Sequence, residues 1–296
     1  MSIVDQLKYQ FKTGGTYIKI IYINVGIYLF FLLIGTLSTL MKWDFNPVII
    51  ENYLTFNSSP IYLIKRPWTI LTYMFLHGSF WHIFNNMLIY FFTARMFEDL
   101  LGKRAALNTY LIGGFCGAIM YLITQNLFPF FRDMGDIPML GASAAVMAVF
   151  VGLATYSPNY EVMLFGVIRV KMKYLAMIWV GFDVIGLANT DGVAHFAHLG
   201  GAIWGYLYII YLRKGKDISS WLNQIQDILG SLFKKKKIKI VYKKSKPVSK
   251  KRKEDNKSRQ EKVDAILDKI KASGYDIHIV GRNNDELSAL SDQTHR

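Results

Sequence analysis

A serine and a histidine stand near the start of two apolar runs, about fifty residues apart in the chain. Ser143 lies in the small-residue tetrapeptide Gly141-Ala142-Ser143-Ala144, and His198 lies in the stretch 194–201. An unassisted serine hydroxyl is a weak nucleophile, so it needs a base such as histidine within about 3 Å. Placing a histidine inside an apolar span costs free energy, so such a residue is expected to have a function. The two residues together predict a nucleophile and its base, both below a membrane surface.

Two further polar side chains open an earlier apolar run. His82 and Asn86 are four residues apart, so on a helix they share one face and can direct polar groups at one point. Polar groups within a membrane are costly, and their clustering therefore favours a site. We expect His82 and Asn86 to join Ser143 and His198 near the outer ends of three helices.

The composition indicates a membrane protein. The chain has 296 residues, of which 52% are hydrophobic and 15% aromatic, which is too apolar for a soluble domain of this size. We therefore expect an all-α polytopic membrane protein. The single cysteine, Cys116, allows no intramolecular disulfide and no cysteine-based metal site. The first apolar run is long and has no small-residue cleavage site, so we interpret it as a retained span rather than a signal peptide.

Six apolar runs are expected to cross the membrane as helices, and they cover about residues 17–40, 80–97, 106–127, 140–156, 174–188 and 193–212. The fourth run is short and rich in Gly and Ala, which is typical of a central helix that others surround. The segment 41–72 is too broken by proline and polar residues to span. Its tryptophans suit the membrane interface, so it is expected to form a partly helical loop at the outer surface.

The distribution of basic residues sets the predicted orientation. Six crossings place both termini on one side, and Lys and Arg gather in the segments on that side, at positions 8, 12, 19, 103, 104, 169, 171, 173, 213, 214 and 216. The positive-inside rule makes that side cytoplasmic. Ser143 and His198 then lie at similar depth near the outer ends of their helices. The predicted location is a bacterial cytoplasmic membrane.

The C-terminal tail, residues 213–296, is predicted to be a separate cytoplasmic segment, after an N-terminal segment 1–16 and a membrane domain 17–212. Residues 213–253 contain fifteen Lys or Arg and two Asp. Apolar residues recur at helical spacing over 218–233, directly before four lysines, which predicts an amphipathic helix on an anionic inner leaflet. The alternative is an ordinary packed helix. We do not expect nucleic-acid binding, because the tail is tethered at the membrane.

Farther along the tail, residues 243–260 are charged, poor in apolar residues and without periodicity, so they are expected to be disordered. A short helix is expected over 259–272, where apolar residues fall on one face. The end of the chain is expected to be loose.

Several motifs together resemble the signature of the rhomboid intramembrane serine proteases, and they are His82-x-x-x-Asn86, Gly141-x-Ser143, Ala197-His198-x-x-Gly201-x-x-x-Gly205, and Pro67-Trp68 in the first outer loop. Each motif alone is weak, but their order, spacing and expected membrane depth are specific. The resemblance covers about residues 17–212 and implies a six-helix rhomboid-like bundle. The tail lies outside it.

The resemblance implies a catalytic dyad of Ser143 as nucleophile and His198 as general base, without a third carboxylate. It also implies that the Ser143 backbone N–H and the side chains of His82 and Asn86 stabilise the oxyanion. We expect no Asp or Glu in the spans near the dyad, so that packing alone positions His198. Gly201 is expected to let the sixth helix approach the fourth. The substrates implied are transmembrane proteins that are cut near the outer end of a helix.

Three positions differ from the family pattern. Ala144 follows the nucleophile where glycine is frequent, and alanine is small enough to be tolerated. Met147 stands where an aromatic residue is frequent, and its thioether can still pack on an imidazole. Glu98 matches only part of the inner-side Glu-x-Arg element, because Leu100 replaces the arginine. We therefore expect no catalytic role for that turn.

Three other functions are compatible with parts of the sequence. A zinc site could be built from histidines, His77, His82, His195 and His198, but no His-Glu-x-x-His motif is present and no carboxylate is expected nearby. We therefore predict no metal and no cofactor, with His195 in packing or hydrogen bonding and His77 fixing the loop at the entrance to the second span. A non-catalytic rhomboid-like protein that binds transmembrane helices is the main alternative. A transporter is disfavoured, because the spans show no inverted repeat.

Overall fold

The computed structural model describes residues 2–43, 48–164, 166–233 and 250–273. The chain divides into two compact units, Met1–Lys234 and Lys235–Arg296. The lysine run at 234–237, the expected disorder over 243–249 and the expected loose end at 274–296 lie outside the described residues.

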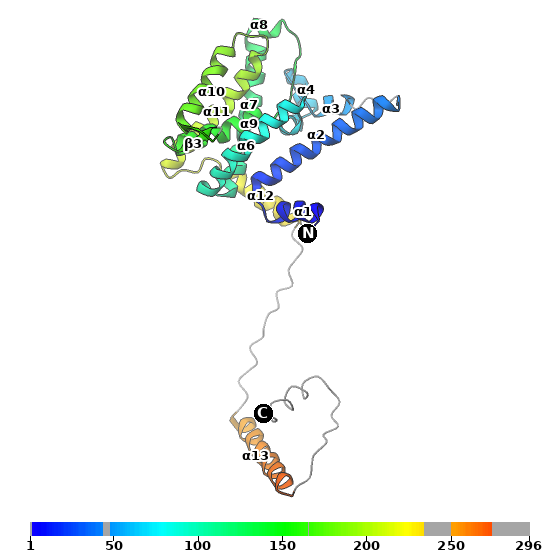
Figure 1. The fold of residues 1–296 in the computed structure, drawn as a ribbon, viewed down its shortest axis with the longest axis vertical. Helices are drawn as coiled ribbons and strands as arrows, with labels where there is room; N and C mark the ends of the chain where they lie inside the picture. Colours follow the sequence, from blue (N-terminus) through cyan, green and yellow to red (C-terminus); the bar gives the residue numbers. More distant parts are fainter. Residues whose placement is uncertain (1, 44–47, 165, 234–249, 274–296) are drawn as a thin grey trace. The chain divides into compact units, whose positions relative to one another are not determined.

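All six segments expected to be helical are helical (Figure 1), and they form α2 (Thr16–Leu40), α6 (Phe80–Leu101), α7 (Lys103–Leu127), α9 (Ser143–Tyr156), α10 (Met172–Gly186) and α11 (Gly192–Arg213). In the described part of the chain, α2, α7 and α11 are long and apolar enough to cross a membrane. The helices α9 and α10 have 14 and 15 residues, and at about 1.5 Å per residue they are shorter than a bilayer core of about 30 Å. The six-crossing topology and the cytoplasmic termini stay predictions.

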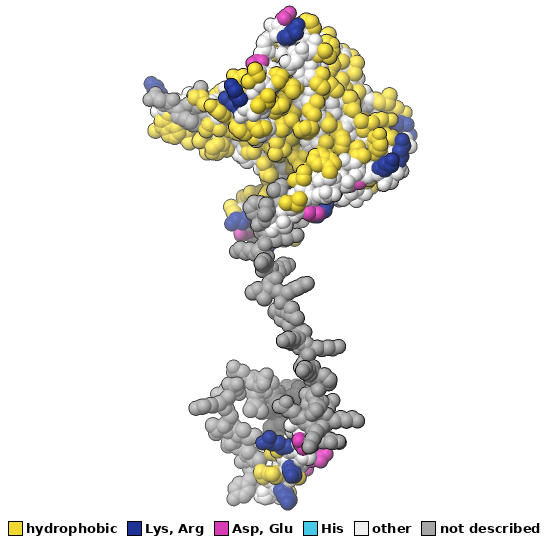
Figure 2. Space-filling model, turned by 180° about the vertical axis from the view of Figure 1, so that it is seen from behind, with side chains coloured by type: hydrophobic (Ala, Val, Ile, Leu, Met, Phe, Trp, Pro, Cys, Tyr) yellow, Lys and Arg dark blue, Asp and Glu magenta, His cyan; other side chains and the backbone are white. Residues whose placement is uncertain are grey.

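The surface of the helical unit is apolar. Figure 2 shows hydrophobic side chains over much of the visible face of the bundle. Exposed large hydrophobic residues lie on α2, α6 and α10, and examples are Leu33, Phe92 and Ile185, which are 61%, 64% and 77% exposed. Such a continuous apolar surface is not stable in water. With the three long apolar helices, it makes the chain an integral membrane protein.

The helix α9 is the centre of the bundle. Ten of its fourteen residues are buried, and it packs against α6, α7 and α11. A Cβ atom on Gly201 would lie 2.0 Å from the Ala144 carbonyl oxygen, and one on Gly205 would lie 2.1 Å from the Ala148 oxygen. The helices α9 and α11 therefore touch backbone to backbone, as small residues allow. The predictions of a central fourth helix and of glycine-mediated contact are confirmed.

A buried carboxylate fixes the start of α2. The two carboxylate oxygens of Glu98, on α6, accept hydrogen bonds from the backbone N–H of Thr16 at 2.9 and 3.2 Å. One of them also accepts from the N–H of Tyr17 at 3.3 Å. These N–H groups have no partner within the helix, and a negative charge at a helix N-terminus is favourable. Glu98 therefore has a structural role in joining α2 to α6.

The segment between α2 and α6 is partly helical, as expected, and contains α3 (Val48–Leu54), α4 (Pro60–Lys65), α5 (Thr69–Thr72) and the 3-10 helix η1 (Tyr73–Phe75). Residues 128–142 contribute α8 (Pro129–Arg132) and β2 (Pro138–Met139), and β2 pairs antiparallel with β1 (Phe56–Asn57). This pairing fixes the loop that leads to Ser143 against the segment between α2 and α6.

The structure is mostly helical, as expected, but it also contains two short antiparallel ladders that the sequence did not predict. Besides β1 and β2, the strands β3 (Glu161–Leu164) and β4 (Ile168–Lys171) form an antiparallel ladder between α9 and α10. Their sequences contain β-branched valine and isoleucine on both sides of a turn at Gly166, whose φ is +73°. Such residues favour an extended ribbon over a helical connection.

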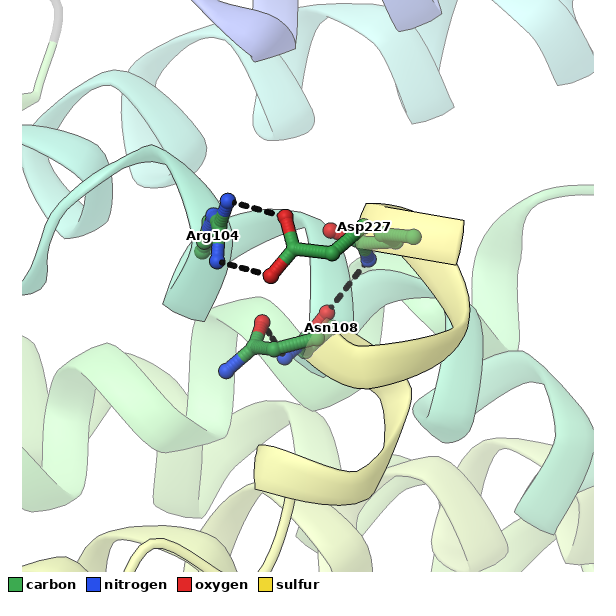
Figure 3. A network of polar contacts seen from close by, with 5 residues as sticks. Arg104, Asn108 and Asp227 are labelled. Carbon is green, nitrogen blue, oxygen red and sulfur yellow. Dashed lines mark hydrogen bonds and ion pairs between the residues drawn. The ribbon is translucent and has the colours of Figure 1, made fainter. Parts of the chain in front are cut away.

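Two amphipathic helices lie at the end of the bundle where α7 begins, and they are α1 (Ile3–Thr13) and α12 (Ser220–Phe233) (Figure 1). A polar network joins α12 to α7 (Figure 3). Asn108 donates to the side-chain oxygen of Asn223 at 2.9 Å and accepts from Gln226 at 2.7 Å. Arg104 makes a two-bond ion pair with Asp227, the shorter bond being 2.6 Å. The helix expected after residue 218 is therefore present and packs on the membrane domain.

The second unit contains α13 (Lys250–Ala272) in its described part. The expected disorder is wrong for residues 250–260, which belong to this helix. They are mainly Lys, Arg, Glu and Gln, which have high helix propensity, and the acidic Glu254 and Asp255 follow four residues after the basic Lys250 and Lys251. The expected helix at 259–272 is its C-terminal half.

Candidate active site

Ser143 is the first residue of α9, and Ala142 is its N-cap. The bond from the Val146 N–H to the Ala142 carbonyl, 2.9 Å long, is the first of the helix. The backbone N–H of Ser143 therefore has no partner one turn earlier, and the positive end of the helix dipole lies at this position. The site combines a hydroxyl with backbone groups that favour a negative charge.

Gly141 brings His82 to this hydroxyl. A Cβ atom on Gly141 would lie 2.6 Å from His82 Nε2 and 3.8 Å from Ser143 Oγ, so both side chains lie against the same glycine. Its φ of +123° also disfavours any residue with a side chain. Gly141 is therefore required for both the turn and the approach of the imidazole.

Asn86 lies one turn after His82 on the same face of α6 and is 5% exposed. One N–H of its amide donates to the His82 carbonyl at 3.1 Å, within its own helix. The amide has a second N–H that remains able to bind another acceptor. The backbone N–H of His82 donates to Ser79, the N-cap of α6, at 3.2 Å. The first turn of α6 thus holds both side chains in place.

His198 is on α11, and its side chain is 19% exposed. It lies close enough to His82 for the two imidazoles to interact electrostatically. No hydrogen bond joins Ser143 Oγ to His198, both of which the structure describes, so the contact predicted from the sequence is not formed here. Catalytic hydrogen bonds are often long in an unliganded site and shorten when the substrate binds.

A carboxylate that the sequence analysis missed lies behind His198. Asp183 is on α10, its side chain is 3% exposed, and its Oδ1 lies 2.8 Å from His198 Nδ1. The same oxygen lies 2.7 Å from Nδ1 of His195. The expectations that no acid lies near the dyad and that packing alone positions His198 are therefore wrong. Asp183 stands alone inside the predicted fifth span, and a lone acid in an apolar run was the signal that could have identified it.

His195 was expected to serve in packing or hydrogen bonding, and it does both. Its ring packs on Gly186, where a Cβ atom would lie 2.3 Å from Nε2. Its Nδ1 bonds to Asp183. The exposed Asp191 lies 3.9 Å from its Nε2.

The expectation that no carboxylate lies near the histidines is wrong, because Asp183 lies beside two of them. Asp183, His195 and His198 offer three ligand atoms within 4.8 Å of one another. The oxygen-to-nitrogen distances of 2.7 and 2.8 Å are those of hydrogen bonds. Two ligands of a tetrahedral zinc, each about 2.0 Å from the metal, would be farther apart, at about 3.3 Å. The arrangement fits hydrogen bonding better than coordination.

His77 lies in the loop before α6 and is packed edge-on against His82, with ring centroids 5.0 Å apart. Both of its ring nitrogens are buried and have no hydrogen-bond partner among the described residues. Burial, and to a lesser extent the neighbouring His82, lowers the pKa of His77 to about 3. His77 therefore stays neutral at physiological pH and supports the ring of His82.

Ala144 and Met147 are both buried in the centre of the bundle. A Cβ atom on Gly117 of α7 would lie 2.4 Å from the Cβ of Ala144, so α7 and α9 also meet closely behind the serine. Met147 is fully buried, one turn after Ser143. Both residues act as core packing in this structure.

The fold and the site define a class: an integral membrane protein of packed helices in which a serine at a helix N-terminus lies beside a histidine of a neighbouring helix. The family model of the rhomboid domain matches residues 65–215, which is half of the chain. The chain belongs to the rhomboid family.

Three curated relatives illustrate the similarity. "RHOMBOID-like protein 12, mitochondrial" of Arabidopsis thaliana is 30% identical over 159 residues, which cover 50% of this chain and 47% of the relative. "Rhomboid protein 1, mitochondrial" of Saccharomyces cerevisiae is 28% identical over 157 residues, covering 50% and 43%. YdcA of Bacillus subtilis is 30% identical over 141 residues, covering 47% and 64%. The chain spans about half the length of the first relatives it matches.

Proposed function

We propose that this chain is an intramembrane serine endopeptidase in which Ser143 is the nucleophile and His198 the general base. One observation carries the proposal: the Ser143 hydroxyl lies at the unsatisfied N-terminus of α9, beside His82 and on a helix in backbone contact with the one that bears His198. A serine that is placed with N–H donors and a nearby imidazole is suited to acyl transfer.

The reaction proceeds in two halves. Ser143 Oγ attacks the scissile carbonyl carbon while its proton passes to His198 Nε2, and the carbonyl oxygen becomes an oxyanion. The tetrahedral intermediate collapses, the C–N bond breaks, and His198 returns the proton to the leaving amine. Water then attacks the acyl enzyme with the same histidine as base. Acid and amine products are released, and the serine is regenerated.

The oxyanion is stabilised from two directions in this proposal. The N–H of Ser143 and the dipole of α9 act from one side. The imidazole of His82 and the free amide N–H of Asn86 act from α6. Removal of one such donor typically lowers the rate by about a hundredfold or more.

The proposed substrates are transmembrane proteins, which would enter laterally from the lipid bilayer. An amide inside a helix is hydrogen-bonded in the ladder, so the segment must unwind before its carbonyl can be attacked. Cleavage is therefore proposed near the outer end of the substrate helix, at small residues next to helix-weakening Gly or Pro. No cofactor takes part in this mechanism.

The cellular membrane is a separate part of the proposal. The names of the relatives include mitochondrial proteins of a plant and a yeast and a protein of a Bacillus. These names do not favour the bacterial cytoplasmic membrane predicted from the sequence over a mitochondrial one. An integral membrane location is common to both.

The first test is cleavage of a transmembrane reporter by the full-length protein in liposomes. A reporter with Gly and Pro near the cut should be cleaved, and the same reporter with leucine at those positions should be cleaved at least about tenfold more slowly, because its helix resists unwinding. A chelator should leave both rates unchanged. Equal rates on the two reporters would contradict the unwinding requirement, and loss of activity with the chelator would favour a metalloenzyme.

A second candidate is a non-catalytic rhomboid-like protein that binds transmembrane helices. The absence of a hydrogen bond between the described Ser143 and His198 is the observation that favours it. A fluorophosphonate probe, which reacts with activated serines, separates the two functions. Labelling at Ser143 supports the peptidase, whereas binding of reporter helices without labelling or cleavage supports the alternative.

A further inference from the structure

The carboxylate behind His198 suggests how the base is positioned. A carboxylate oxygen accepts hydrogen bonds, so an ionised Asp183 requires Nδ1 of both His198 and His195 to carry hydrogen. In a neutral His198 the lone pair then resides on Nε2, the other end of the ring. This is the tautomer that a general base needs in order to take a proton from serine.

The second histidine, His195, positions the carboxylate of Asp183, whereas His198 is the base that acts on the serine. Asp183 is buried, and its other oxygen, Oδ2, has no hydrogen-bond partner among the described residues. The two bonds at Oδ1 are therefore the ones that orient the group. Because His195 is packed on Gly186 of α10, it ties the start of α11 to the end of α10 around this carboxylate.

We propose that Asp183 is a positioning residue for the proposed catalytic base, and that His195 anchors it, so that His198, Asp183 and His195 form one hydrogen-bonded chain across α10 and α11. This inference rests on the proposed function. It replaces a two-residue dyad by a site in which a buried carboxylate fixes the tautomer of His198 and stabilises the imidazolium formed during the reaction.

The charged groups around His198 determine how the reaction rate should depend on pH. Among the described residues, the titratable groups next to this cluster are His82 on α6, which interacts electrostatically with His198, and the exposed Asp191 at the start of α11, which lies beside His195. Asp183 is the buried acid among them. Removing its charge should disfavour the imidazolium, so the acid limb of the pH–rate profile should move to lower pH.

The test is the variant Asp183→Asn in the full-length protein. We expect kcat/KM for the reporter to fall by about a hundredfold or more, with the acid limb displaced to lower pH. His195→Gln should give a smaller loss, because Asp183 keeps its bond to His198. The control is Asp191→Asn, which removes an exposed acid 3.9 Å from His195 and should leave the rate unchanged.

A second readout does not depend on catalysis. Diethyl pyrocarbonate modifies neutral imidazoles, so the pH dependence of His198 modification, followed by mass spectrometry, should shift to lower pH in Asp183→Asn. If the protein cleaves its reporter but Asp183→Asn changes neither profile, the positioning role is overturned, even if thermal stability falls. If no reporter is cleaved but the modification profile still shifts, the positioning role stands and the peptidase proposal fails.

An independent observation concerns the helix α12. It is bound to α7 by its polar side, through Asn223, Gln226 and Asp227. Trp221, Ile225 and Ile228 are on the opposite face at helical spacing, and they are 52%, 43% and 62% exposed. A soluble amphipathic helix packs the other way, with its apolar side against the protein. The apolar face of α12 therefore points away from the bundle.

The position of α12 in the bundle indicates that lipid covers its apolar face. The helix is bonded to the start of α7 at Arg104, and basic residues lie at both span ends there, Lys103 on α7 and Arg213, Lys214 and Lys216 at the end of α11. In the same unit, α1 has the exposed apolar residues Ile3, Val4, Leu7 and Phe11, and Phe11 stacks on Tyr22 of α2. Two short amphipathic helices with basic neighbours at the ends of apolar spans are typical of a membrane interface.

We propose that α12 lies in the lipid–water interface, with Trp221, Ile225 and Ile228 among the acyl chains and with its polar side fixed to α7. Anionic headgroups are the lipid component that the surrounding Lys and Arg would bind. The polar network makes α12 an integral part of the membrane domain, rather than part of a freely attached tail.

The test uses the full-length protein without its single cysteine, as Cys116→Ala, with the added substitution Ile225→Cys for an environment-sensitive fluorophore. The matched control is Lys216→Cys, just before the helix. In phosphatidylcholine vesicles, the probe at 225 should emit as in an apolar medium and be quenched by spin-labelled lipid, and added phosphatidylglycerol should strengthen both effects. The probe at 216 should be quenched by aqueous iodide instead. Aqueous quenching at 225, or shielding there from both quenchers, would overturn the proposal.

Discussion

Replacing Ser143 with alanine should abolish cleavage of the reporter, with kcat lowered by a factor of about 10⁴ or more. The hydroxyl is the group that forms the acyl enzyme in the proposed mechanism, and no other described side chain at the N-terminus of α9 can replace it. His198→Ala should lower the rate by a similar factor, because nucleophile and base act as a unit. Both rates are measured on the same reporter in liposomes.

The serine variant also offers a clean structural control. Ser143 lies between two alanines at the start of α9, and its side chain is half-buried without a hydrogen bond to His198. Ser143→Ala should therefore keep the unfolding temperature of the wild type while it loses labelling by the fluorophosphonate probe. Residual cleavage by this variant at the wild-type rate would exclude Ser143 as the nucleophile.

Replacing Gly201 with alanine should disrupt both the packing and the activity. The added Cβ would lie 2.0 Å from the backbone oxygen of Ala144, directly after the nucleophile, and backbone cannot move aside as a flexible side chain does. Overpacking of this kind typically costs about 1–3 kcal/mol. It should also separate α11 from α9 and so move His198 away from Ser143.

Gly181→Ala on α10 is the matched control, because nothing lies within 4 Å of a Cβ atom at that position. Alanine is favoured over glycine in a helix by up to about 1 kcal/mol, so this variant should be as stable as the wild type or more so. Thermal unfolding in detergent compares the two, and probe labelling is measured at a temperature where both remain folded. Equal stability and labelling of the two variants would refute the close contact.

The helices were predictable from the sequence because apolar length and glycine spacing are local properties. The runs around Gly201 and Gly205 indicated close packing, and the structure has them in backbone contact with α9. The strands β1 to β4 were not predicted, because each ladder depends on a partner segment rather than on its own two to four residues. The N-terminal half of α13 was missed because its charges suggested disorder, although its residues favour helix.

The site was predictable only in part, because some of its contacts depend on how separate helices pack rather than on local sequence. The motifs around Ser143, His198 and His82 could be read one at a time, and the structure brings Ser143 and His82 against one glycine. The partnership of Asp183 with two histidines depends on how α10 packs on α11, which no local pattern encodes. Its position alone in an apolar run was the available signal, and it was overlooked because the resemblance implied a site without a carboxylate.

The groups of the proposed site arrive on separate helices, His82 on α6, Ser143 on α9, Asp183 on α10 and His198 on α11. Each of these four residues is on a different helix, so the site is complete only while all four helices keep their relative positions. A shift of about 1 Å at any of their interfaces can cost about a hundredfold in rate. Activity in this protein should therefore decline before the helices melt, and a rate measurement would detect loosened packing earlier than circular dichroism.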